Sequence, residues 1–213
     1  MTDKLAEMRY EYTKEILFRK DLNPNPYQQF NTWFDQITPF DPMGANAFTL
    51  STIGEGNRPS GRIILLKGVE GKGFVFYTNY GSRKAKEMNN QQLASMCFFW
   101  GPLERQLRIE GRIVRVSAES SDAYFQSRPR ESQLGAHVSP QSDIIADRSY
   151  LEDKFKAVEE MYAEGTIPRP EQWGGYALIP DYFEFWQGRA NRLHDRFSYT
   201  LIDGDWKINR LAP

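Results

Sequence analysis

The stretch GRIILLKGVEGKGFVFYTN, residues 61–79, decides the fold. It holds two apolar runs on either side of the glycine-rich segment EGKG, a pattern that predicts two β-strands joined by a tight turn. The C-terminal stretch RFSYTLIDGDWKINRLAP repeats the arrangement, with Asp203-Gly204 as the turn. Strands joined by such short turns run antiparallel, so both stretches predict an antiparallel sheet.

Further strands are predicted on both sides of residues 61–79. They fall at residues 47–54, 93–100, 105–116 and 174–188, where apolar, β-branched and aromatic residues gather. Within residues 105–116 the apolar register shifts after Gly111, which predicts a β-bulge.

Helices are predicted between the strands. Apolar residues recur at spacings of three and four in residues 27–37 and 149–165, and Gly165 is expected to end the second helix. The remaining segments are a helix at 82–91 with Ser82 as N-cap, a capped helix from 117 that stops at Pro129, a loop at 134–145 and a charged helical arm at 1–20. Hairpins with helices gathered between them predict an α+β, mainly β fold, an antiparallel β-barrel with peripheral helices, as one domain over residues 1–213.

The composition excludes several classes of function. Lys+Arg (27) and Asp+Glu (28) nearly cancel to a net charge of -1, which argues against a nucleic-acid coat or a polybasic membrane binder. The single cysteine, Cys97, excludes an internal disulfide and a cysteine-rich metal site, and its apolar neighbours predict a buried thiol. Because the N-terminus has no apolar leader and no later segment approaches about 18 apolar residues, we expect a cytoplasmic protein.

Familiar catalytic motifs are missing from the sequence. It has no G-x-G-x-x-G after a strand, no P-loop, no G-x-S-x-G, and no histidine or cysteine spacing suited to a metal. If the chain is an enzyme, a bound cofactor is therefore expected to carry the chemistry.

Basic residues stand where a phosphate would need them. Arg83 and Lys84 open the helix that follows Ser82, where cations oppose the helix dipole unless an anion is bound. Arg62 and Lys67 bracket an apolar run, and their odd spacing would send them to opposite faces of a regular strand. They would then serve two ligands or two parts of one site. The alternative for both pairs is that the charges simply reach solvent.

Two further segments suggest a second anion site. Tyr124, Arg128 and Ser132 lie four residues apart, so they would share a helix face if the helix persisted through Pro129. The alternative is a helix end with a solvated arginine. The stretch WQGRANRLHDR, residues 186–196, places three arginines and His194 beside Trp186. Arg192 and His194 alternate as in a strand, which predicts that both face one pocket, although a lone histidine is also compatible with a structural role.

Together these motifs resemble the pyridoxamine (pyridoxine) 5′-phosphate oxidase family, FMN enzymes that complete pyridoxal 5′-phosphate synthesis. The resemblance runs from about residue 40 to the last residue and rests on the stretches GRIILLKG, FVFYTNYGSRKAKE, RQLRIEGRIVRV, YFQSRPRESQLGAHVSPQS, EFWQGRANRLHDR and WKINRLAP. It implies an FMN-binding split β-barrel, antiparallel and Greek-key-like, that forms a homodimer with FMN at the interface. The N-terminal stretch MRYEYTKEIL resembles the family's arm, which closes over the active site.

The resemblance also implies roles for individual residues. The cofactor FMN would be bound by Arg62, Ile63, Ile64, Leu65, Leu66, Lys67, Tyr77, Thr78, Arg83, Lys84, Gln106, Gln141, Ser142, Trp186 and Arg196, with Gln141 and Ser142 coming from the other subunit. The substrate would be bound by Lys67, Tyr124, Arg128, Ser132, Arg192, Leu193 and His194, with Arg9 and Tyr12 from the arm. Arg192 and His194 would be the catalytic pair.

The implied reaction is oxidation of pyridoxamine 5′-phosphate or pyridoxine 5′-phosphate to pyridoxal 5′-phosphate. A hydride would pass from C4′ to flavin N5, and O2 would reoxidise the flavin and give H2O2. Two alternatives stay open, a split-barrel flavin reductase that uses NAD(P)H and a non-catalytic carrier of pyridoxal 5′-phosphate or FMN. The sequence does not choose between the amine and the alcohol substrate.

Overall fold

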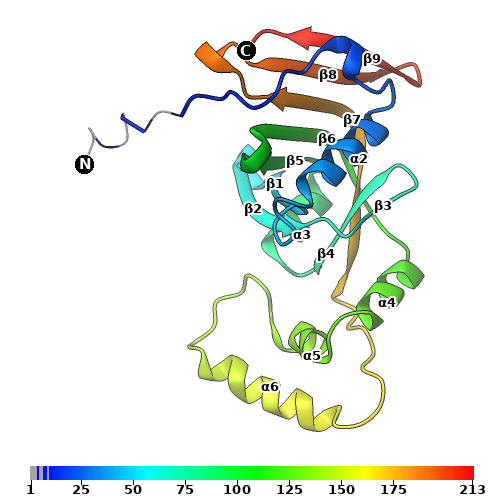
Figure 1. The fold of residues 1–213 in the computed structure, drawn as a ribbon. Coiled ribbons are helices and arrows are strands. Elements are labelled where there is room, and N and C mark those ends of the chain that lie inside the picture. The colour runs from blue at the N-terminus through cyan, green and yellow to red at the C-terminus, as the bar shows by residue number, and fades with distance from the viewer. Residues whose placement is uncertain (1–3, 5–6, 9) are drawn as a thin grey trace. The chain divides into compact units, whose positions relative to one another are not determined.

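The computed structural model describes Lys4, Glu7, Met8 and residues 10–213. The chain forms two compact units, and Figure 1 labels their helices and strands. Unit 1 contains residues up to Leu50, Ser95–Gly111 and Pro180–Pro213, and unit 2 contains Ser51–Ala94 and Arg112–Ile179. That residues 1–213 fold as a single domain stays a prediction. Among the described residues, the helices are all too short or too polar to cross a membrane.

Antiparallel strands make up most of the regular structure. In the described residues they are β1 Ala47–Ile53, β2 Pro59–Leu65, β3 Gly68–Glu70, β4 Gly73–Asn79, β5 Leu93–Trp100, β6 Arg105–Arg115, β7 Trp173–Gln187, β8 Asp195–Ile202 and β9 Asp205–Leu211. They pair in the order β2-β1-β5-β6-β7-β4-β3, and β8 joins β7 to β9. The early half of β7 pairs with β4 and its late half with β8. The mainly β, antiparallel prediction is confirmed.

Along the chain, the helices of the described residues stand before or between the strands. They are α2 Pro26–Ile37, α3 Arg83–Asn90, α4 Ala118–Gln126, α5 Arg130–Val138 and α6 Ser149–Met161. Helix α2 begins at Pro26, one residue before its predicted start, because the Asn25 side chain accepts a hydrogen bond from the Tyr27 N–H and proline suits the first helical position.

Unit 1 has an aromatic core under α2. Phe30, Trp33 and Ile37 of α2 are buried, and the Trp33 ring meets Phe185 of β7 edge-on with 5.0 Å between centroids. The β8–β9 hairpin turns at Asp203-Gly204, where both residues have positive φ (52° and 88°). Positive φ at both central residues is the requirement of the tight turn that an Asp-Gly pair predicts, so that prediction is confirmed.

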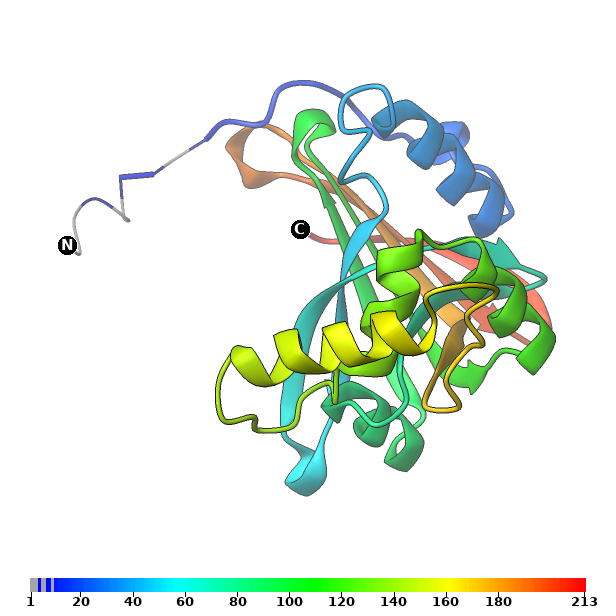
Figure 2. The ribbon, with the colours of Figure 1, turned by 90° about the horizontal axis from the view of Figure 1, so that it is seen from below.

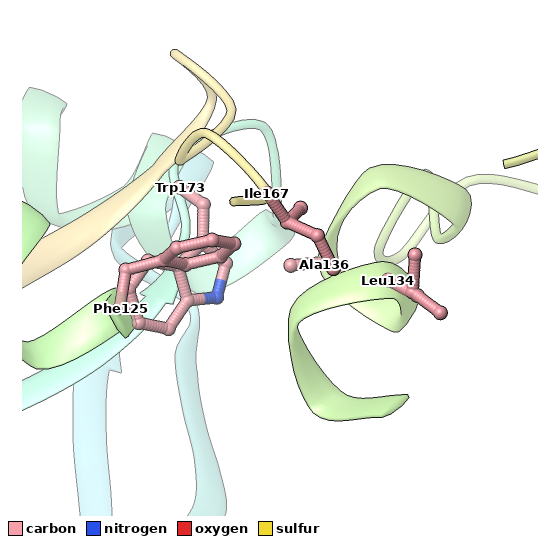
Figure 3. Packing of buried hydrophobic residues seen from close by; sticks show 5 residues of the cluster. All are labelled: Phe125, Leu134, Ala136, Ile167 and Trp173. Carbon is pink, nitrogen blue, oxygen red and sulfur yellow. The ribbon is translucent and has the colours of Figure 1, made fainter. Parts of the chain in front are cut away.

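Unit 2 carries the second aromatic core, between α4, α5 and the start of β7. Its buried members are Phe125, Leu134, Ala136, Ile167 and Trp173, and Figure 3 shows the Phe125 and Trp173 rings packed together with Ile167 beside Ala136 of α5. Helices α5 and α6 lie side by side (Figures 1 and 2). This core fixes the end of α4, the start of α5 and the start of β7 relative to one another.

Three predictions about local structure are wrong. Residues 134–138 are helical instead of a loop, because Pro129 ends α4 but its carbonyl accepts from the Ser132 and Gln133 N–H groups and so begins α5. Residues 61–79 form three strands instead of two, since β2 stops at Leu65 before β3 begins. The burial alternation of β6 continues through Gly111 to Ile113, so the expected shift of register is not found.

Two helix boundaries also differ from expectation. Helix α6 ends at Met161, before Gly165. Tyr10–Phe18 of the expected helical arm are not helical, because their polar groups bond to unit 1 side chains, whereas Lys4 is helical and Arg19–Asp21 form a 3-10 helix. Tyr10 Oη donates to Glu104 Oε1 (2.8 Å), and the Leu17 N–H donates to Asp195 Oδ2 (3.2 Å).

Candidate functional site

A cavity of about 660 Å³ lies within unit 2. Segments far apart in the sequence meet there: β2 and the residues after it, β4, α3, the α4–α5 junction, the loop after α5 and the start of β7. Eleven of the predicted site residues line it, namely Ile63, Ile64, Leu65, Lys67, Tyr77, Thr78, Lys84, Tyr124, Arg128, Ser132 and Gln141. The sequence interpretation missed six others, Asn79, Pro129, Gly135, Ala136, Ser139 and Trp173.

Lys84 is a buried cation in this cavity. Its Nζ donates to Gln141 Oε1 (2.7 Å) and Thr78 Oγ1 (3.2 Å), and no carboxylate of the described residues forms an ion pair with it. Burial lowers the pKa of Lys84 to about 8; the charge of Arg62 adds to the shift and Glu87 opposes it. An anion in the cavity would reverse that shift, so Lys84 fits a phosphate. Gln141 reaches Lys84 of its own chain, whereas the resemblance implied that it comes from the other subunit.

Ser82 does not cap α3 with its side chain, although it occupies the N-cap position. Its hydroxyl donates to the Asn79 carbonyl instead (2.7 Å). The first N–H groups of α3 therefore receive no side-chain acceptor from Ser82.

Arg128 presents an unsatisfied donor. Its Nη1 is buried and has no hydrogen-bond partner among the described residues. The guanidinium carbon lies 4.5 Å from the centre of the Trp173 ring, and burial lowers the pKa of Arg128 while Tyr124 opposes the shift. A buried donor without a partner costs about 1–3 kcal/mol, more when it is charged. The group is therefore suited to an anion that enters the cavity.

Tyr124, Arg128 and Ser132 line the same cavity although the helix does not persist. Tyr124 belongs to α4, Ser132 to α5, and Arg128 to the break between them. The break is held by Gln133, whose Nε2 donates to the Arg128 carbonyl (2.9 Å). The predicted convergence is therefore found, but two helices supply it in place of one helix face.

Arg83 and Lys84 line different cavities. Arg83 joins Ser142 at a second cavity in unit 2, of about 590 Å³, together with Glu55, Arg58, Lys86, Glu87 and Asn90. Consecutive helix residues point about 100° apart, so a single compact site for both cations is not formed within unit 2. Arg62 and the buried Leu66 line neither cavity.

Glu87 forms ion pairs with two of the arginines that were predicted to bind FMN. Its carboxylate pairs with Arg62 (3.0 Å) and Arg83 (2.8 Å) and also accepts from the Ser60 and Thr52 hydroxyls (2.6 and 2.5 Å). Burial alone would raise the pKa of Glu87, but these four hydrogen bonds hold it at about 2. Glu87 is 6% exposed, so the carboxylate stays ionised and charge-balances the cations beside it.

We expect Glu87→Gln to lower the free energy of unfolding at pH 7 by roughly 3 kcal/mol. Because the folded pKa lies below the usual 4.5, the stabilisation is present above pH 4.5 and is lost as pH falls towards about 2. Urea unfolding should therefore show wild type and variant converging as pH falls through this window. The matched control is Glu152→Gln in the exposed Arg148 pair, which should change stability by less than about 0.5 kcal/mol. A pH-independent difference for Glu87→Gln would contradict the account.

Unit 1 holds a second cluster of predicted residues around Trp186. The His194 ring lies 4.6 Å from Trp186, and Tyr12 of the arm meets both rings edge-on at 5.4 and 5.6 Å. His194 Nδ1 accepts from the Arg189 N–H (3.1 Å). Burial, followed by the charges of Arg192 and Arg196, lowers the pKa of His194 against the opposing Asp195. The imidazole is therefore neutral near pH 7, with Nε2 carrying its proton.

Arg192 lies in a tight turn and not in a strand. The turn Ala190–Arg192 precedes β8, and both Asn191 and Arg192 have positive φ (56° and 60°). The predicted strand-like alternation of Arg192 and His194 is therefore wrong. Positive φ is rare for an arginine and tends to be kept at functional sites. Arg192 and Leu193 are exposed, and Arg192 forms no hydrogen bond or ion pair with the part of the chain that the structure describes.

The other predicted residues of unit 1 are paired or partly exposed. Arg196 of β8 forms an ion pair with the buried Glu184 (2.8 Å) and donates to the Ala212 carbonyl (2.7 Å). Gln106 of β6 is half-buried. Arg9 lies outside the described residues. Cys97, predicted as a buried thiol, is half-buried, and its pKa is raised by burial, which does not favour a nucleophile.

The missed cavity residues left only one signal in the sequence. Trp173 ends a proline-rich connection, and Gly174-Gly175 open the predicted strand. Two glycines inside a strand often mark a close approach by other groups. Of the other missed residues, Asn79 ends β4, and the rest lie in the segment from Pro129 to Ser139, which was predicted as a helix end and a loop.

Comparison with known proteins gives matches along most of the chain. Residues 37–162 match the family model described as pyridoxamine 5′-phosphate oxidase. Residues 173–213 match the pyridoxine 5′-phosphate oxidase C-terminal dimerisation region. The pyridoxine/pyridoxamine 5′-phosphate oxidase of Pseudomonas savastanoi pv. phaseolicola is 49% identical over 215 residues, 100% of each chain. That of Rippkaea orientalis is 49% identical over 210 residues, 98% of this chain and 99% of the relative.

Solved structures give the same fold. PhzG from Burkholderia lata, in complex with tetrahydrophenazine-1-carboxylic acid, matches with a TM-score of 0.87 at 27% identity, over 93% of this chain and 98% of that one. A pyridoxamine 5′-phosphate oxidase-related, FMN binding protein from Nostoc punctiforme matches with a TM-score of 0.71 at 17% identity, over 90% and 100%. The second likeness shows the fold alone. By full-length identity and by fold, this chain belongs to the pyridoxine/pyridoxamine 5′-phosphate oxidase family, with its FMN-binding split-barrel fold.

Proposed function

We propose that the chain oxidises pyridoxamine 5′-phosphate and pyridoxine 5′-phosphate to pyridoxal 5′-phosphate with FMN as its cofactor. Full-length relatives at 49% identity carry this activity in their names. The observation that carries the proposal at the level of residues is the unpartnered Nη1 of Arg128 in a cavity that Lys67, Tyr124 and Ser132 also line. Two cations and two hydroxyls around one space are suited to a phosphomonoester.

The residues of unit 2 fit FMN as well. Lys84, buried and without a carboxylate partner, would hold the FMN phosphate together with Thr78 and Gln141. Ile63, Ile64 and Leu65 would line the flavin, and Arg62 and Arg83 would add charge from their places on Glu87. FMN, when bound, supplies the acceptor for the two electrons that leave the substrate.

The remaining steps fall to residues of this chain. The substrate phosphate is bound by Arg128, Lys67, Tyr124 and Ser132. These contacts hold the substrate in a fixed orientation for the reaction. Arg192, an exposed cation with no partner among the described residues, stabilises charge beside the C4′ substituent. His194, neutral and with Nδ1 accepting from the Arg189 N–H, would orient the pyridine ring by donating its Nε2–H. Trp186, Gln106 and Arg196 would contact the flavin ring system. The family resemblance would add Tyr12 and Arg9, the latter outside the described residues, to the substrate site.

A homodimer is supported by the match of residues 173–213 to a dimerisation region. FMN lies at the interface of the two subunits in this proposal. The cytoplasmic expectation stands as part of the same proposal.

Purified protein tests the function directly. It should be yellow with a flavin spectrum, consume O2 when given pyridoxamine 5′-phosphate, and release pyridoxal 5′-phosphate and H2O2. Colour without turnover would favour the carrier, and turnover only with NAD(P)H would favour the flavin reductase. Failure to bind FMN would end the proposal.

We expect Arg192→Ala to lower kcat/KM for pyridoxamine 5′-phosphate by at least tenfold with little change in FMN affinity. A charge-assisted contact of about 1.5–3 kcal/mol accounts for that loss. Steady-state kinetics and FMN titration of the apoprotein separate the two effects. The control is Arg148→Ala, an exposed arginine on the surface of unit 2, which should leave both unchanged. Selective loss of FMN in Arg192→Ala would contradict its role toward the substrate.

A further inference from the structure

Trp173 lines the unit 2 cavity and contacts Arg128. The sequence patterns did not predict a functional role for it. It opens β7 and is 8% exposed. Its own position is fixed at both backbone ends, since its N–H donates to the Pro170 carbonyl (3.0 Å) and its carbonyl accepts from Arg169 Nη1 (2.7 Å). Figure 3 shows its ring against Phe125, with 5.3 Å between the ring centroids. The ring is therefore a rigid wall.

The face of this ring carries the Arg128 guanidinium. Arg128 Cζ stands 4.5 Å from the Trp173 centroid and 5.6 Å from the Phe125 centroid. A guanidinium over the face of an indole is attracted by the ring's negative π surface. The nitrogen Nη1 remains unpartnered. The ring therefore holds the cation and leaves its N–H donors free. A carboxylate in the same place would accept hydrogen bonds from those donors.

The same ring is nearly parallel to the two tyrosines of the cavity. Trp173 and Tyr77 have centroids 5.5 Å apart at 8°, Trp173 and Tyr124 6.2 Å apart at 5°, and the two tyrosines 3.9 Å apart at 12°. Burial first, with the nearby acidic groups, raises the pKa of Tyr77 to about 12, so the hydroxyl stays neutral. These offset stacks constrain the Tyr124 ring, whose hydroxyl belongs to the proposed phosphate set.

Gly175 makes room for this arrangement. It pairs with Tyr77 in the β4–β7 ladder, and a Cβ there would stand 2.7 Å from Tyr77 Cε1. Trp173 and Gly175 point to the same face of β7 because they are two residues apart. The short motif that opens β7 therefore supplies both the wall and the space beside it.

We propose that Trp173 is the positioning residue of the substrate-phosphate site: its ring holds the Arg128 guanidinium, and with it the Tyr124 ring, in place before the phosphate arrives. The proposal rests on the function proposed above. It adds the contact that keeps the Arg128 guanidinium ordered beside the cavity. Preorganisation of this kind changes the binding of the phosphate group and leaves the chemistry at C4′ alone.

The test compares Trp173→Leu and Trp173→Phe in the FMN-loaded enzyme. We expect Trp173→Leu to raise KM for pyridoxamine 5′-phosphate and Kd for the product pyridoxal 5′-phosphate by the same factor, about five to twentyfold. The kcat should stay within about twofold, and kcat/KM for unphosphorylated pyridoxamine should not change. Trp173→Phe keeps a flat ring and should restore most of the affinity.

A matched control separates positioning from general packing. Phe76→Leu removes another buried ring of unit 2, one that stacks on Tyr176 (6.0 Å) and does not line the cavity. It should lower Tm without altering the preference for the phosphorylated substrate. If Trp173→Leu lowered kcat/KM equally for both substrates, as Phe76→Leu would through loss of packing, the proposal would be overturned.

An isosteric series keeps the test decisive if Trp173→Leu does not fold. Site-specific incorporation of mono-, di- and trifluorotryptophan at position 173 retains the shape of the ring and weakens its negative face. KM for pyridoxamine 5′-phosphate should rise stepwise with fluorination, and a flat series would refute the proposal. If the Trp173 variants left KM for pyridoxamine 5′-phosphate unchanged while Arg128→Ala raised it, only the inference about Trp173 would be refuted. Wild type without turnover would remove the proposed function itself.

Discussion

Arg128→Ala is expected to raise KM for pyridoxamine 5′-phosphate at least tenfold while kcat falls much less. The guanidinium offers a buried Nη1 with no partner among the described residues, so the phosphate would be its first acceptor. A charge-assisted hydrogen bond contributes about 1.5–3 kcal/mol, which corresponds to roughly 10- to 150-fold in affinity. Initial-rate kinetics with the FMN-loaded variant measure the change.

Arg130→Ala is the matched control for this prediction. Arg130 is two residues away, but its guanidinium donates to the backbone carbonyls of Tyr162 and Gly165 (the latter at 3.2 Å) and does not line the cavity. Its KM should stay near the wild-type value. An unchanged KM in Arg128→Ala would remove Arg128 from the phosphate site, and equal increases in both variants would point to disturbance of the α4–α5 junction.

Lys84→Met is expected to raise the stability of the FMN-free protein and to lower its affinity for FMN. It should stabilise the FMN-free protein at pH 7, because the folded state then no longer buries a charge whose pKa is lowered from 10.5 to about 8. That shift corresponds to roughly 3 kcal/mol, before any loss of hydrogen bonds to Thr78 and Gln141. FMN affinity should fall at least tenfold, because the phosphate loses a charged donor.

The stability of the apoprotein should depend on pH because of Lys84. A lysine whose folded pKa lies below its unfolded value costs stability below the folded pKa, so wild-type apoprotein should gain stability as pH rises from about 8 to 10.5. Lys84→Met should lack that rise, while the exposed Lys156→Met control should keep it. Urea unfolding and quenching of FMN fluorescence measure the two effects. Lower apoprotein stability together with unchanged FMN affinity in Lys84→Met would contradict the assignment.

Sequence patterns predicted those features that depend on neighbours in the chain. The Asp203-Gly204 turn follows from two residues that tolerate positive φ, and α2 follows from its apolar face. The cation-rich start of α3 likewise drew attention to Lys84, because like charges at a helix start need an anion to offset them. In each case the physical cause lies within about one helical turn.

Tertiary contacts decided what local patterns could not. Arg83 and Lys84 are adjacent cations in the sequence and look equivalent there. In the structure Arg83 forms an ion pair with Glu87, whereas Lys84 donates a hydrogen bond to Gln141, which is far along the chain. Nothing in the sequence ties Tyr10 to Glu104, so the arm was expected to be helical. Trp173 carries no charge, and only its contact with Arg128 indicates what it does.

The central claim is that the cations and hydroxyls of the unit 2 cavity recognise the substrate through its phosphate. The most direct measurement is the ratio of kcat/KM for pyridoxamine 5′-phosphate to kcat/KM for pyridoxamine, in wild type and in Arg128→Ala. Two or more charge-assisted contacts predict a ratio above about 100 for wild type and a reduction of at least tenfold in the variant. Equal kcat/KM for the two substrates, or a ratio that Arg128→Ala leaves unchanged, would contradict the claim.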